Sequence, residues 1–397
     1  MLTYEQALKR LAKATPSPRP ARAALHDALG LVLAQRIIAP LDLPPCDNSA
    51  VDGYAIRPPA PDATLHVIGK AEAGRPFGAR VRPGEAVRIF TGALVPRGAD
   101  RIIMQEHVSR DGDRITFERW PDIGRHIRRR GEDLRRGTHV LEAGTQLRPQ
   151  EIGLLAALGY RHIPVCSTPT VAILTTGDEL QQPGGRLKPG HIYESNGALL
   201  DALVTREGAR AIRLGLARDV FRQLVARIRR GLRYDILLVS GGVSVGEKDL
   251  VRAALKACGV REVFWRVNIK PGMPLFFGTR GRTLVFGLPG NPVSVFVTFE
   301  EFVKPALFRL MGRVWQDGYT ESAGLVNDLQ VSTTRRTHFL RVRCSSHNPL
   351  VAEPMNGQAS HQLRSLVEAD GWIRVVSSES PWPAGTQVLV KRELGPC

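Results

Sequence analysis

The regular alternation of apolar strands with amphipathic helices between residues 170 and 310 constrains the fold of this chain most strongly. Its clearest element is Ile236–Val239, an uncharged run of branched residues that is typical of a strand buried on both faces of a parallel sheet. The other expected strands are Val171–Thr176, Glu262–Val267 and Thr283–Pro289, and the expected helices are Asn196–Gly208, Phe221–Arg233 and Pro292–Leu310. Strands that alternate with helices predict a doubly wound, mostly parallel α/β sheet.

The sequence on either side of this region has a different pattern. Between residues 60 and 145, short alternating strands are separated by Gly and Pro turns, which predicts a β-rich module, and short strands return after Trp315. Helices are expected over residues 2–35, with Ala21–Ala34 as the second of two, and over Arg148–Gly159. The resulting prediction is a helical and linking region at 1–45 and 138–168, an inserted β-rich domain at 46–137, an α/β domain at 169–316 and a small β domain at 317–397.

The composition is that of a globular protein without a membrane span. Of the 397 residues, 43% are hydrophobic and 23% are charged, and no stretch approaches the roughly 20 apolar residues of a membrane-spanning helix. The N-terminus lacks an apolar signal core. The five cysteines are scattered and form no CxxC pair, so neither a disulfide framework nor a zinc site is expected, and the expected location is the cytoplasm.

The chain carries a net charge of +17, and its strongest basic run is His126–Arg136. Only nine of the 55 basic residues are lysine; the rest are arginine. Nucleic-acid binding is one interpretation, because basic patches attract phosphate. An arginine-biased solvated face, or attraction of a small anionic substrate, is favoured instead, since no nucleic-acid-binding signature accompanies the charge and aromatic residues make up only 6%.

A glycine-rich loop follows the central apolar strand. Ser240, Gly241 and Gly242 offer backbone that can turn tightly and approach a ligand closely, and ligands of open α/β sheets bind at this end of the strands. Four acids also follow predicted strand ends: Asp178, Glu179, Glu247 and Asp249. Carboxylates beside a bound phosphate would suit Mg²⁺, although solvated loop acids would have the same pattern.

Two further loops suggest an anion site. In the segment Leu288–Ser294, Asn291 can cap a helix that starts at Pro292, which would leave the amides of Val293 and Ser294 free to cradle an oxyanion. The alternative is an ordinary proline-led helix start. In the segment Lys270–Pro274, two prolines stiffen the loop and fix the direction of Lys270.

A rival interpretation is a serine hydrolase. The run from Gly242 to Gly246 matches the G-x-S-x-G nucleophile elbow, with Ser244 as the nucleophile, and three histidines lie downstream at positions 338, 347 and 361. These histidines fall in the predicted C-terminal β domain, no HGGG-type oxyanion segment is present, and Glu247 and Asp249 would oppose a developing negative charge. The pattern therefore favours ligand binding over hydrolysis.

Eight motifs in order resemble the molybdenum insertases (molybdopterin molybdenumtransferases) of the MoeA and gephyrin E-domain type. They are DNSAVDGYAIR, IFTGALVPRGADRIIMQE, GEDLRRG, TPTVAILTTGDEL, YESNGALL, SGGVSVGEKD, KPGMP and LPGNPVSVFV, and they extend from Asp47 to about Pro305. The resemblance implies an enzyme that inserts molybdate into adenylylated molybdopterin with release of AMP in a Mg²⁺-dependent step. It also implies a four-domain chain with a C-terminal β-barrel, and a homodimer whose active site is shared between subunits.

The resemblance also implies roles for particular residues. Carried over motif by motif, the partner subunit's loops would supply Asp52, Thr91 and Asp133. The α/β domain would supply Glu179, Asp219, Ser240, Gly241, Gly242, Ser244, Asp249, Lys270, Pro289, Pro292 and Ser294. Among these, Glu179 and Asp249 would handle Mg²⁺, Lys270 and Ser294 would face molybdate, and the glycine-rich loop would hold the pterin phosphate.

Three departures from the family pattern stand out. The second lysine usual in the KPGKP loop is Met273, Arg266 stands where lysine is common, and Val51 stands where methionine is usual. Arg266 keeps a charge with a different geometry; either it compensates for Met273, or the affinity for molybdate is lower. The alternative is a paralogue with altered or lost insertion, serving tungstate or binding pterin as a scaffold. Expected partners are an adenylyltransferase that delivers the pterin and chaperones of molybdoenzymes, with neither nucleic acid nor membrane.

Overall fold

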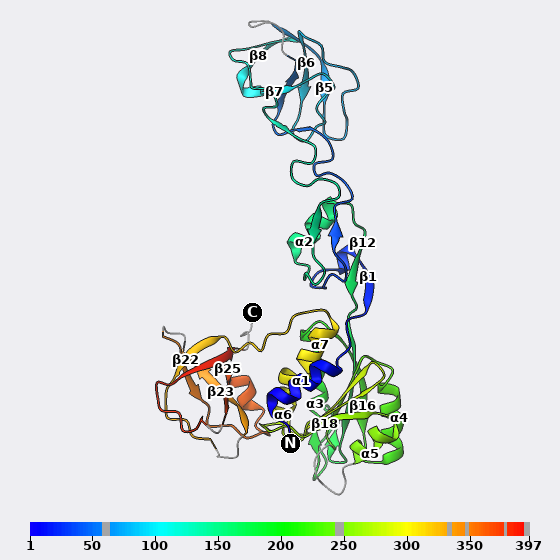
Figure 1. Cartoon of the computed structure of the whole chain (residues 1–397), viewed down its shortest axis with the longest axis vertical. Helices are drawn as coiled ribbons and strands as arrows, with labels where there is room; N and C mark the ends of the chain where they lie inside the picture. Colours follow the sequence, from blue (N-terminus) through cyan, green and yellow to red (C-terminus); the bar gives the residue numbers. More distant parts are fainter. Residues whose placement is uncertain (58–63, 243–249, 332–335, 346–348, 377–378, 393–397) are drawn as a thin grey trace. The chain divides into compact units, whose positions relative to one another are not determined.

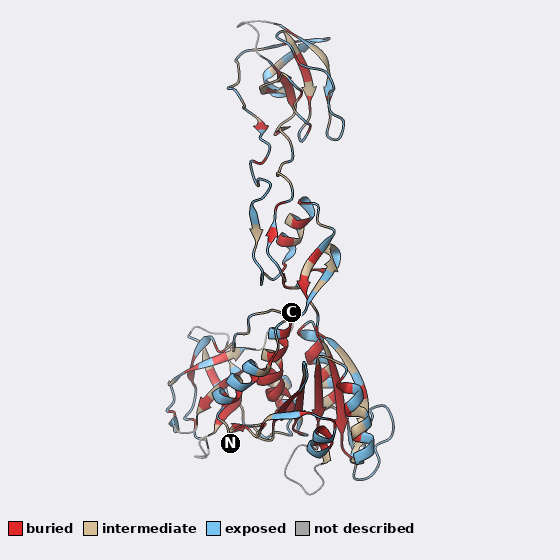
Figure 2. Ribbon diagram, turned by 45° about the vertical axis from the view of Figure 1, so that its right-hand side comes forward, coloured by how far each residue is buried: buried red, intermediate tan, exposed pale blue. Residues whose placement is uncertain are grey.

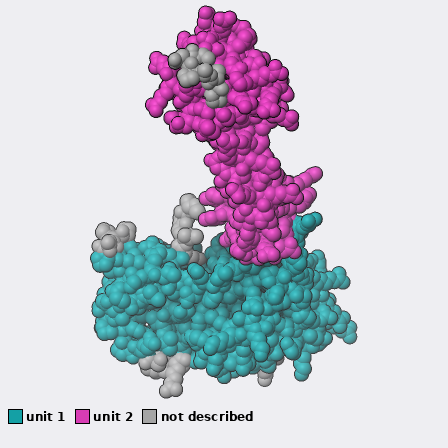
Figure 3. Space-filling view, turned by 45° about the horizontal axis from the view of Figure 1, so that its top comes forward, with its two compact units in different colours: residues 1–22, 165–397 teal, residues 23–164 magenta. Residues whose placement is uncertain are grey.

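The computed structural model describes residues 1–57, 64–242, 250–331, 336–345, 349–376 and 379–392. The chain divides into two compact units, one formed by Met1–Arg22 with Val165–Cys397 and the other by Ala23–Pro164 (Figure 3). The expected division into four domains stays a prediction. The two units are described in turn.

A six-stranded sheet forms the centre of the first unit (Figure 1). Its strands lie in the order β16 (Arg210–Ala217), β13 (Thr170–Thr176), β17 (Ile236–Ser240), β21 (Thr283–Leu288), β20 (Phe276–Arg280) and β18 (Arg261–Trp265). The first four strands are mutually parallel, whereas β20 is antiparallel to both of its neighbours. The mostly parallel α/β sheet expected from the sequence is confirmed.

Helices cover both faces of this sheet, as a doubly wound fold requires (Figure 2). Helices α4 (Phe221–Gly231) and α5 (Leu250–Ala257) pack on one face, where Leu237 and Val239 of β17 point. Helices α1 (Tyr4–Ala14), α3 (Asn196–Arg206) and α6 (Pro292–Thr298) pack on the other face, where Ile236 and Leu238 point. All four of these β17 side chains are fully buried, which explains the uninterrupted apolar run.

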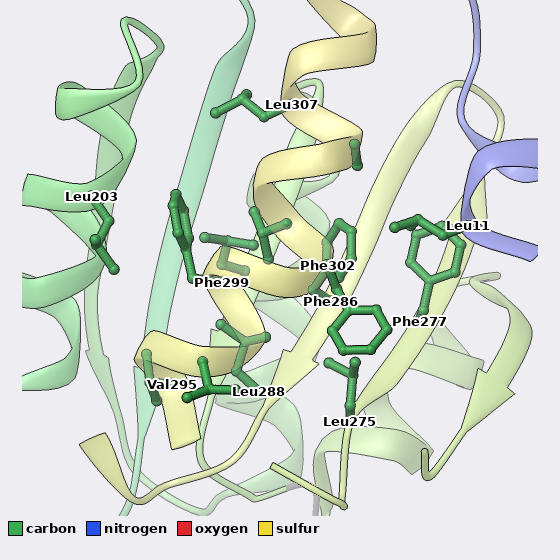
Figure 4. Close-up of a cluster of buried hydrophobic side chains, with 14 of the residues drawn as sticks. Leu11, Leu203, Leu275, Phe277, Phe286, Leu288, Val295, Phe299, Phe302 and Leu307 are labelled. Carbon is green, nitrogen blue, oxygen red and sulfur yellow. The ribbon is translucent and has the colours of Figure 1, made fainter. Parts of the chain in front are cut away.

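The larger core surrounds the last helical segment of the sheet domain (Figure 4). Helix α6 continues through a π-helical segment, Phe299–Val303, into α7 (Lys304–Leu310). Phe299 and Phe302 belong to the same buried cluster as Phe286 and Phe277 of the sheet, with Phe299 on the side of Leu203. Each fully buried Phe or Leu side chain contributes roughly 1.5–3 kcal/mol to folding, so this cluster holds α6 firmly on the sheet.

The C-terminal part of the first unit is a closed five-stranded barrel. Strands β23 (Thr337–Cys344), β24 (Val351–Pro354), β22 (Glu321–Leu325), β26 (Gln387–Arg392) and β25 (Gly371–Val376) pair in that order, and β25 pairs back with β23. The short strand β19 (Ile269–Lys270) joins this barrel beside β23, and helix α8 (Arg364–Glu368) packs on it. The expected C-terminal β-barrel is confirmed.

The second unit is rich in short strands. A six-stranded sheet has the order β7 (Arg101–Met104), β4 (Gly53–Ile56), β6 (Glu85–Ile89), β5 (Leu65–Ala71), β9 (Arg114–Phe117) and β8 (Val108–Asp111). Two-stranded ribbons pair β3 (Asn48–Ser49) with β10 (Ile127–Arg128), and β2 (Ile37–Ile38) with β11 (His139–Leu141). Helix α2 (Pro149–Ala157) matches the helix expected at Arg148–Gly159.

Two expectations about secondary structure need correction. The second N-terminal helix expected at Ala21–Ala34 is wrong: this segment contains β1 (Pro20–Ala24), paired with β12 (His162–Cys166), and one short 3₁₀ turn, Leu25–Asp27. Pro20 opens the strand, and Gly30 with a φ of 77° interrupts any helix. In addition, strand β20 was not expected, because its sequence FFGTR has no alternation.

Candidate active site at the carboxyl ends of the sheet strands

The carboxyl ends of three parallel strands lie side by side and form the floor of the candidate site. Thr175 of β13 is in register with Ser240 of β17, and Ser240 with Leu288 of β21. The Gly241 amide donates to the Leu288 carbonyl oxygen at 3.1 Å. The glycine-rich loop and the Pro289–Gly290 turn are therefore joined where an open α/β sheet binds its ligand.

Only glycine fits at the two positions after Ser240. Gly241 has a φ of 95°, and a Cβ atom there would lie 2.3 Å from the Thr176 carbonyl oxygen. Gly242 has a φ of 60°, and its Cβ would lie 2.6 Å from Cγ2 of Val251. The chain thus turns tightly against β13 and α5, with no side chain to separate a ligand from the backbone.

Acidic side chains gather beside this floor, after the ends of β13 and β16. The Thr176 hydroxyl donates to Oδ1 of Asp219 at 2.5 Å, and the Asp219 amide donates to Oδ1 of Asp178 at 3.2 Å. The exposed Glu179 carboxylate folds back on Gly177, where a Cβ atom would lie 2.7 Å from Oε1 of Glu179. The structure therefore brings Asp178, Glu179 and Asp219 to one sheet edge.

The Lys270 loop lies against helix α6. Gly272 has a φ of 103°, and its Cβ would lie 2.7 Å from Thr298 Cγ2 and 3.7 Å from the Ser294 carbonyl oxygen. Lys270 itself is exposed. The lysine loop thus packs on the last residue of α6, and its place beside the Ser294 helix start stays a prediction.

The start of α6 differs from expectation in one respect. The Val293 amide, expected to be free for an oxyanion, donates to the Ser360 carbonyl oxygen at 3.1 Å. The Asn291 side chain donates to Oγ of Ser360 at 2.8 Å and makes no capping bond among the described residues. Ser294 is buried, with 3% of its surface exposed. A loop of the C-terminal barrel thus occupies part of the predicted cradle.

Ser360 and its support, Arg341, were not found by sequence reasoning. The buried Arg341 guanidinium on β23 donates through Nη2 to the carbonyl oxygens of Gly357 (2.7 Å) and Ala359 (3.4 Å). Burial lowers the pKa of Arg341 to about 10. Within the part of the chain that the structure describes, its Nε and Nη1 have no hydrogen-bond partner. No local pattern in a β domain signals such a contact with a helix that lies earlier in the chain.

Two cationic residues near the lysine loop are held by the fold. Arg266 has a left-handed φ of 64°, and its guanidinium carbon lies 4.2 Å from the centre of the Trp265 ring. Arg252 stacks on the same ring at 4.2 Å. The Met273 carbonyl oxygen accepts the amides of Val267 and Leu275, so Met273 anchors the loop through its backbone.

His338 of β23 is in register with Lys270 of β19, and only 2% of its surface is exposed. Its burial, followed by the positive charges of Lys270 and Arg336, lowers the pKa of His338 to about 4. The imidazole is therefore neutral at physiological pH and adds no charge beside Lys270.

The remaining predicted residues belong to the second unit. Both the amide and the hydroxyl of Thr91 donate to Oδ1 of Asp52, each at 2.7 Å. These two bonds, followed by the charge of Arg88, lower the pKa of Asp52. Asp133 is exposed on the same unit, and its amide donates to the Leu43 carbonyl oxygen.

Several predicted residues fall outside the described part of the chain. They are Ser244, Glu247 and Asp249 of the glycine-rich loop and His347 of the hydrolase hypothesis. The four described cysteines are free thiols, and the described residues contain no group of three His, Cys, Asp or Glu placed to hold a metal. No described helix has the length and apolar character needed to cross a membrane.

Comparison with known proteins places this site in a family. Residues 2–159 match the MoeA N-terminal region (domain I and II), and residues 330–392 match the MoeA C-terminal region (domain IV). Residues 172–309 match a probable molybdopterin binding domain. A molybdopterin molybdenumtransferase of Haemophilus influenzae is 36% identical over 98% of both chains. The chain belongs to the MoeA family.

Other MoeA relatives agree. Molybdopterin molybdenumtransferase 2 of Mycobacterium tuberculosis is 37% identical over 94% of this chain and 95% of its own length. The crystal structure of a molybdopterin biosynthesis MoeA protein from Pyrococcus horikoshii superimposes with a TM-score of 0.83 at 30% identity, over 99% of both chains. These findings confirm the family, the multidomain fold class and the transferase class expected from the sequence, and they give no support to a paralogue that has lost insertion.

Proposed function

We propose that this chain is a molybdopterin molybdenumtransferase, which inserts molybdate into adenylylated molybdopterin and releases AMP. The observation that carries the proposal is the joined pair of loops at the strand ends, the glycine turn at Gly241 and the Pro289–Gly290 turn, together with the Lys270 loop that packs on α6, the helix after the second turn. The first two present bare backbone to a phosphate, and the third presents an ammonium group to an oxyanion.

The substrates explain why so few nucleophiles are needed. A polyanionic nucleotide and a molybdate oxyanion must be brought together, so cations and amides must offset their mutual repulsion. The dithiolene sulfurs of the pterin would attack molybdenum while one molybdate oxygen leaves as water with the two thiol protons, and the protein mainly positions the two partners. Lys270 supplies positive charge, and the neutral His338 beside it neither adds to that charge nor competes for the anion.

The acidic sheet edge fits a Mg²⁺ ion. Mg²⁺ is commonly held by one or two carboxylates together with substrate phosphate oxygens, so a cluster of three protein ligands is not required. Glu179 and Asp219 offer such carboxylates among the described residues, and Asp249 remains a predicted third. When bound, the ion would neutralise the phosphates from which AMP departs.

A shared site in a homodimer completes the proposal. Asp52 and Thr91 are fixed to each other by two hydrogen bonds, in a unit distinct from the one that holds Lys270 and Gly241. Together with Asp133, they would face the carboxyl ends of the sheet strands in the partner subunit. An adenylyltransferase would then deliver the pterin, and a molybdoenzyme chaperone would receive the product.

The test is a direct assay with purified protein, adenylylated molybdopterin, molybdate and Mg²⁺. AMP release should require molybdate, and the product should activate a cofactor-free molybdoenzyme. Omission of molybdate or of Mg²⁺ serves as the control. AMP release that is independent of molybdate, or an inert product, would rule out insertion.

Met273 offers a sharper test of the anion site. Met273→Lys adds a second ammonium group to the Lys270 loop and should lower the KM for molybdate by up to roughly tenfold, with the gain reduced by added salt. The matched control is Lys188→Met, which changes an exposed lysine outside this loop. An unchanged molybdate KM in Met273→Lys would show that position 273 does not face the anion.

A further inference from the structure

One polar side chain bridges the loops of the candidate site. Asn196 is the first residue of α3, and its Nδ2 donates to Oγ of Ser240 at 3.0 Å and to the Gly290 carbonyl oxygen at 2.6 Å. The Ser240 hydroxyl in turn donates to the Pro289 carbonyl oxygen at 3.3 Å. A single amide group therefore ties the start of one helix to the ends of two strands.

The position of Asn196 is itself fixed by its neighbours. The Gly197 amide donates to the buried Glu194 carboxylate, which also receives Nη2 of Arg213 at 3.0 Å. A Cβ atom at Gly197 would lie 2.8 Å from Oε2 of Glu194, so a larger residue there would displace the Glu194 carboxylate. The preceding Ser195 makes no side-chain capping bond to any residue that the structure describes. Glu194 therefore anchors the start of α3, and the side-chain amide of Asn196 bonds to the two loops.

The bridge adds to two other bonds between the described parts of these loops, from the Gly241 amide to the Leu288 carbonyl oxygen and from the Ser240 hydroxyl to the Pro289 carbonyl oxygen. Gly241 and Gly290 approach each other closely, since a Cβ at Gly290 would lie 4.0 Å from the Gly241 Cα atom. Glycines lose more backbone freedom on ordering than other residues. A two-way hydrogen bond from a fixed side chain reduces the freedom of both loops before any ligand binds.

We propose that Asn196 is a positioning residue that pre-organises the Ser240–Gly242 loop and the Pro289–Gly290 turn for the phosphate of a nucleotide. The inference rests on the proposed function for the identity of that ligand. Asn196 acts through Ser240 and Gly290, and it makes no step of the reaction itself. Its loss should weaken binding of AMP and of adenylylated molybdopterin, and should leave the use of molybdate unchanged.

The test compares Asn196→Ala and Asn196→Asp with Ser195→Ala. The aspartate variant keeps the shape but removes the donor, so it should behave like the alanine variant. Both Asn196 variants should bind AMP roughly tenfold more weakly by calorimetry and raise the KM for adenylylated molybdopterin by a similar factor, with a molybdate KM within about twofold of wild type. Ser195→Ala should match the wild type in all three measurements.

Hydrogen exchange supplies a readout that does not depend on activity. The segments that contain Gly241 and Gly290 should exchange faster in both Asn196 variants and at the wild-type rate in Ser195→Ala. Unchanged exchange in these segments, or unchanged AMP affinity, overturns the inference. If the variants differ from wild type in exchange as described, but the wild type releases no AMP in response to molybdate, the proposed function is overturned instead.

Discussion

At the scale of single residues, His338 illustrates how burial sets a charge state beside Lys270, the lysine of the proposed anion site. Its Nε2 is buried without a hydrogen-bond partner among the described residues, and Lys270 is its neighbour across the β19–β23 pair. A protonated ring at this position would place two cations side by side in a desolvated environment. Its neutrality leaves Lys270 as the cation of this strand pair.

The lowered pKa of His338 predicts a pH dependence of stability. The folded state holds the imidazole neutral down to about pH 4, whereas the unfolded chain binds a proton below about pH 6.5. The free energy of unfolding is therefore unaffected by this histidine above about pH 6.5. It decreases as the pH falls toward 4, by no more than about 1.4 kcal/mol per pH unit.

Urea unfolding of wild type and His338→Asn at several pH values checks this prediction. The wild type should lose more stability than the variant between pH 7 and pH 5. His361→Asn, which changes an exposed histidine of the same unit, should retain the wild-type slope. Parallel slopes for wild type and His338→Asn would contradict the prediction.

At the scale of secondary-structure elements, the turn from β17 toward α5 decides the shape of the site. Gly241→Ala should destabilise the protein, because left-handed backbone costs a non-glycine residue roughly 1–2 kcal/mol and the added methyl group meets the Thr176 carbonyl oxygen. AMP binding should fall at least about tenfold by calorimetry, since the loop must shift.

Gly281→Ala is the matched control for this turn. Gly281 has a φ of 58° in the hairpin between β20 and β21, and a Cβ atom added there would have no described atom within 4 Å. It therefore carries the backbone cost without the steric clash. Equal losses of AMP affinity in the two variants would show that the contact with Thr176 is unimportant.

The elements also show what sequence alone could predict. The buried strand at Ile236–Val239 and the glycine turn were predictable, because uninterrupted apolar residues and paired glycines each have few structural solutions. The helix expected at Ala21–Ala34 was wrong, since pairing of β1 with β12 outweighed its alanine-rich pattern.

The rest of the site depends on contacts between distant segments. The bond from Asn196 to Ser240 spans 44 residues, and that from Asn291 to Ser360 spans 69. Neither Asn196 nor Ser360 differs locally from an ordinary helix start or loop residue. Their roles follow only when the sheet and the barrel have placed them beside their partners.

At the scale of the first unit, a buried ionic cluster joins the sheet domain to the barrel. Glu301 in the π-helical segment accepts bonds from Tyr4 at 2.6 Å and Lys391 at 3.1 Å, and Lys391 also pairs with Glu300 at 3.2 Å. Burial would raise the pKa of Glu300, but the positive charges of Lys391, Lys304 and Arg206 outweigh it and lower the pKa. The cluster holds the barrel that carries Ser360 against the helix that begins at Pro292.

Lys391→Met should therefore destabilise the first unit by about 3–5 kcal/mol near pH 7, because it leaves buried Glu301 without its lysine and removes one of the cations of Glu300. In the wild type, the lowered pKa of Glu300 gives stability that is present above its ordinary value near 4.5 and is lost as the pH falls through the folded value. The difference between variant and wild type should shrink toward pH 4, where the carboxyl groups take up protons.

Thermal unfolding at pH 7 and pH 4.5 measures this difference. The control is Lys256→Met, which changes an exposed lysine on α5 and should alter stability by less than about 0.5 kcal/mol. A penalty for Lys391→Met that does not depend on pH would show that lost packing, rather than unpaired charge, is responsible.

The Lys391–Glu301 contact also has a consequence for the order in which the molecule can mature. Glu301 leaves the ribosome 90 residues before Lys391, a delay of about 5 to 20 seconds at ordinary rates of synthesis. During that interval Glu301 lacks its lysine partner, whereas Glu300 already has Lys304 and Arg206 beside it. The contact that joins the π-helical segment to the barrel can therefore form only after strand β26 has been made, so the first unit completes its packing late in synthesis.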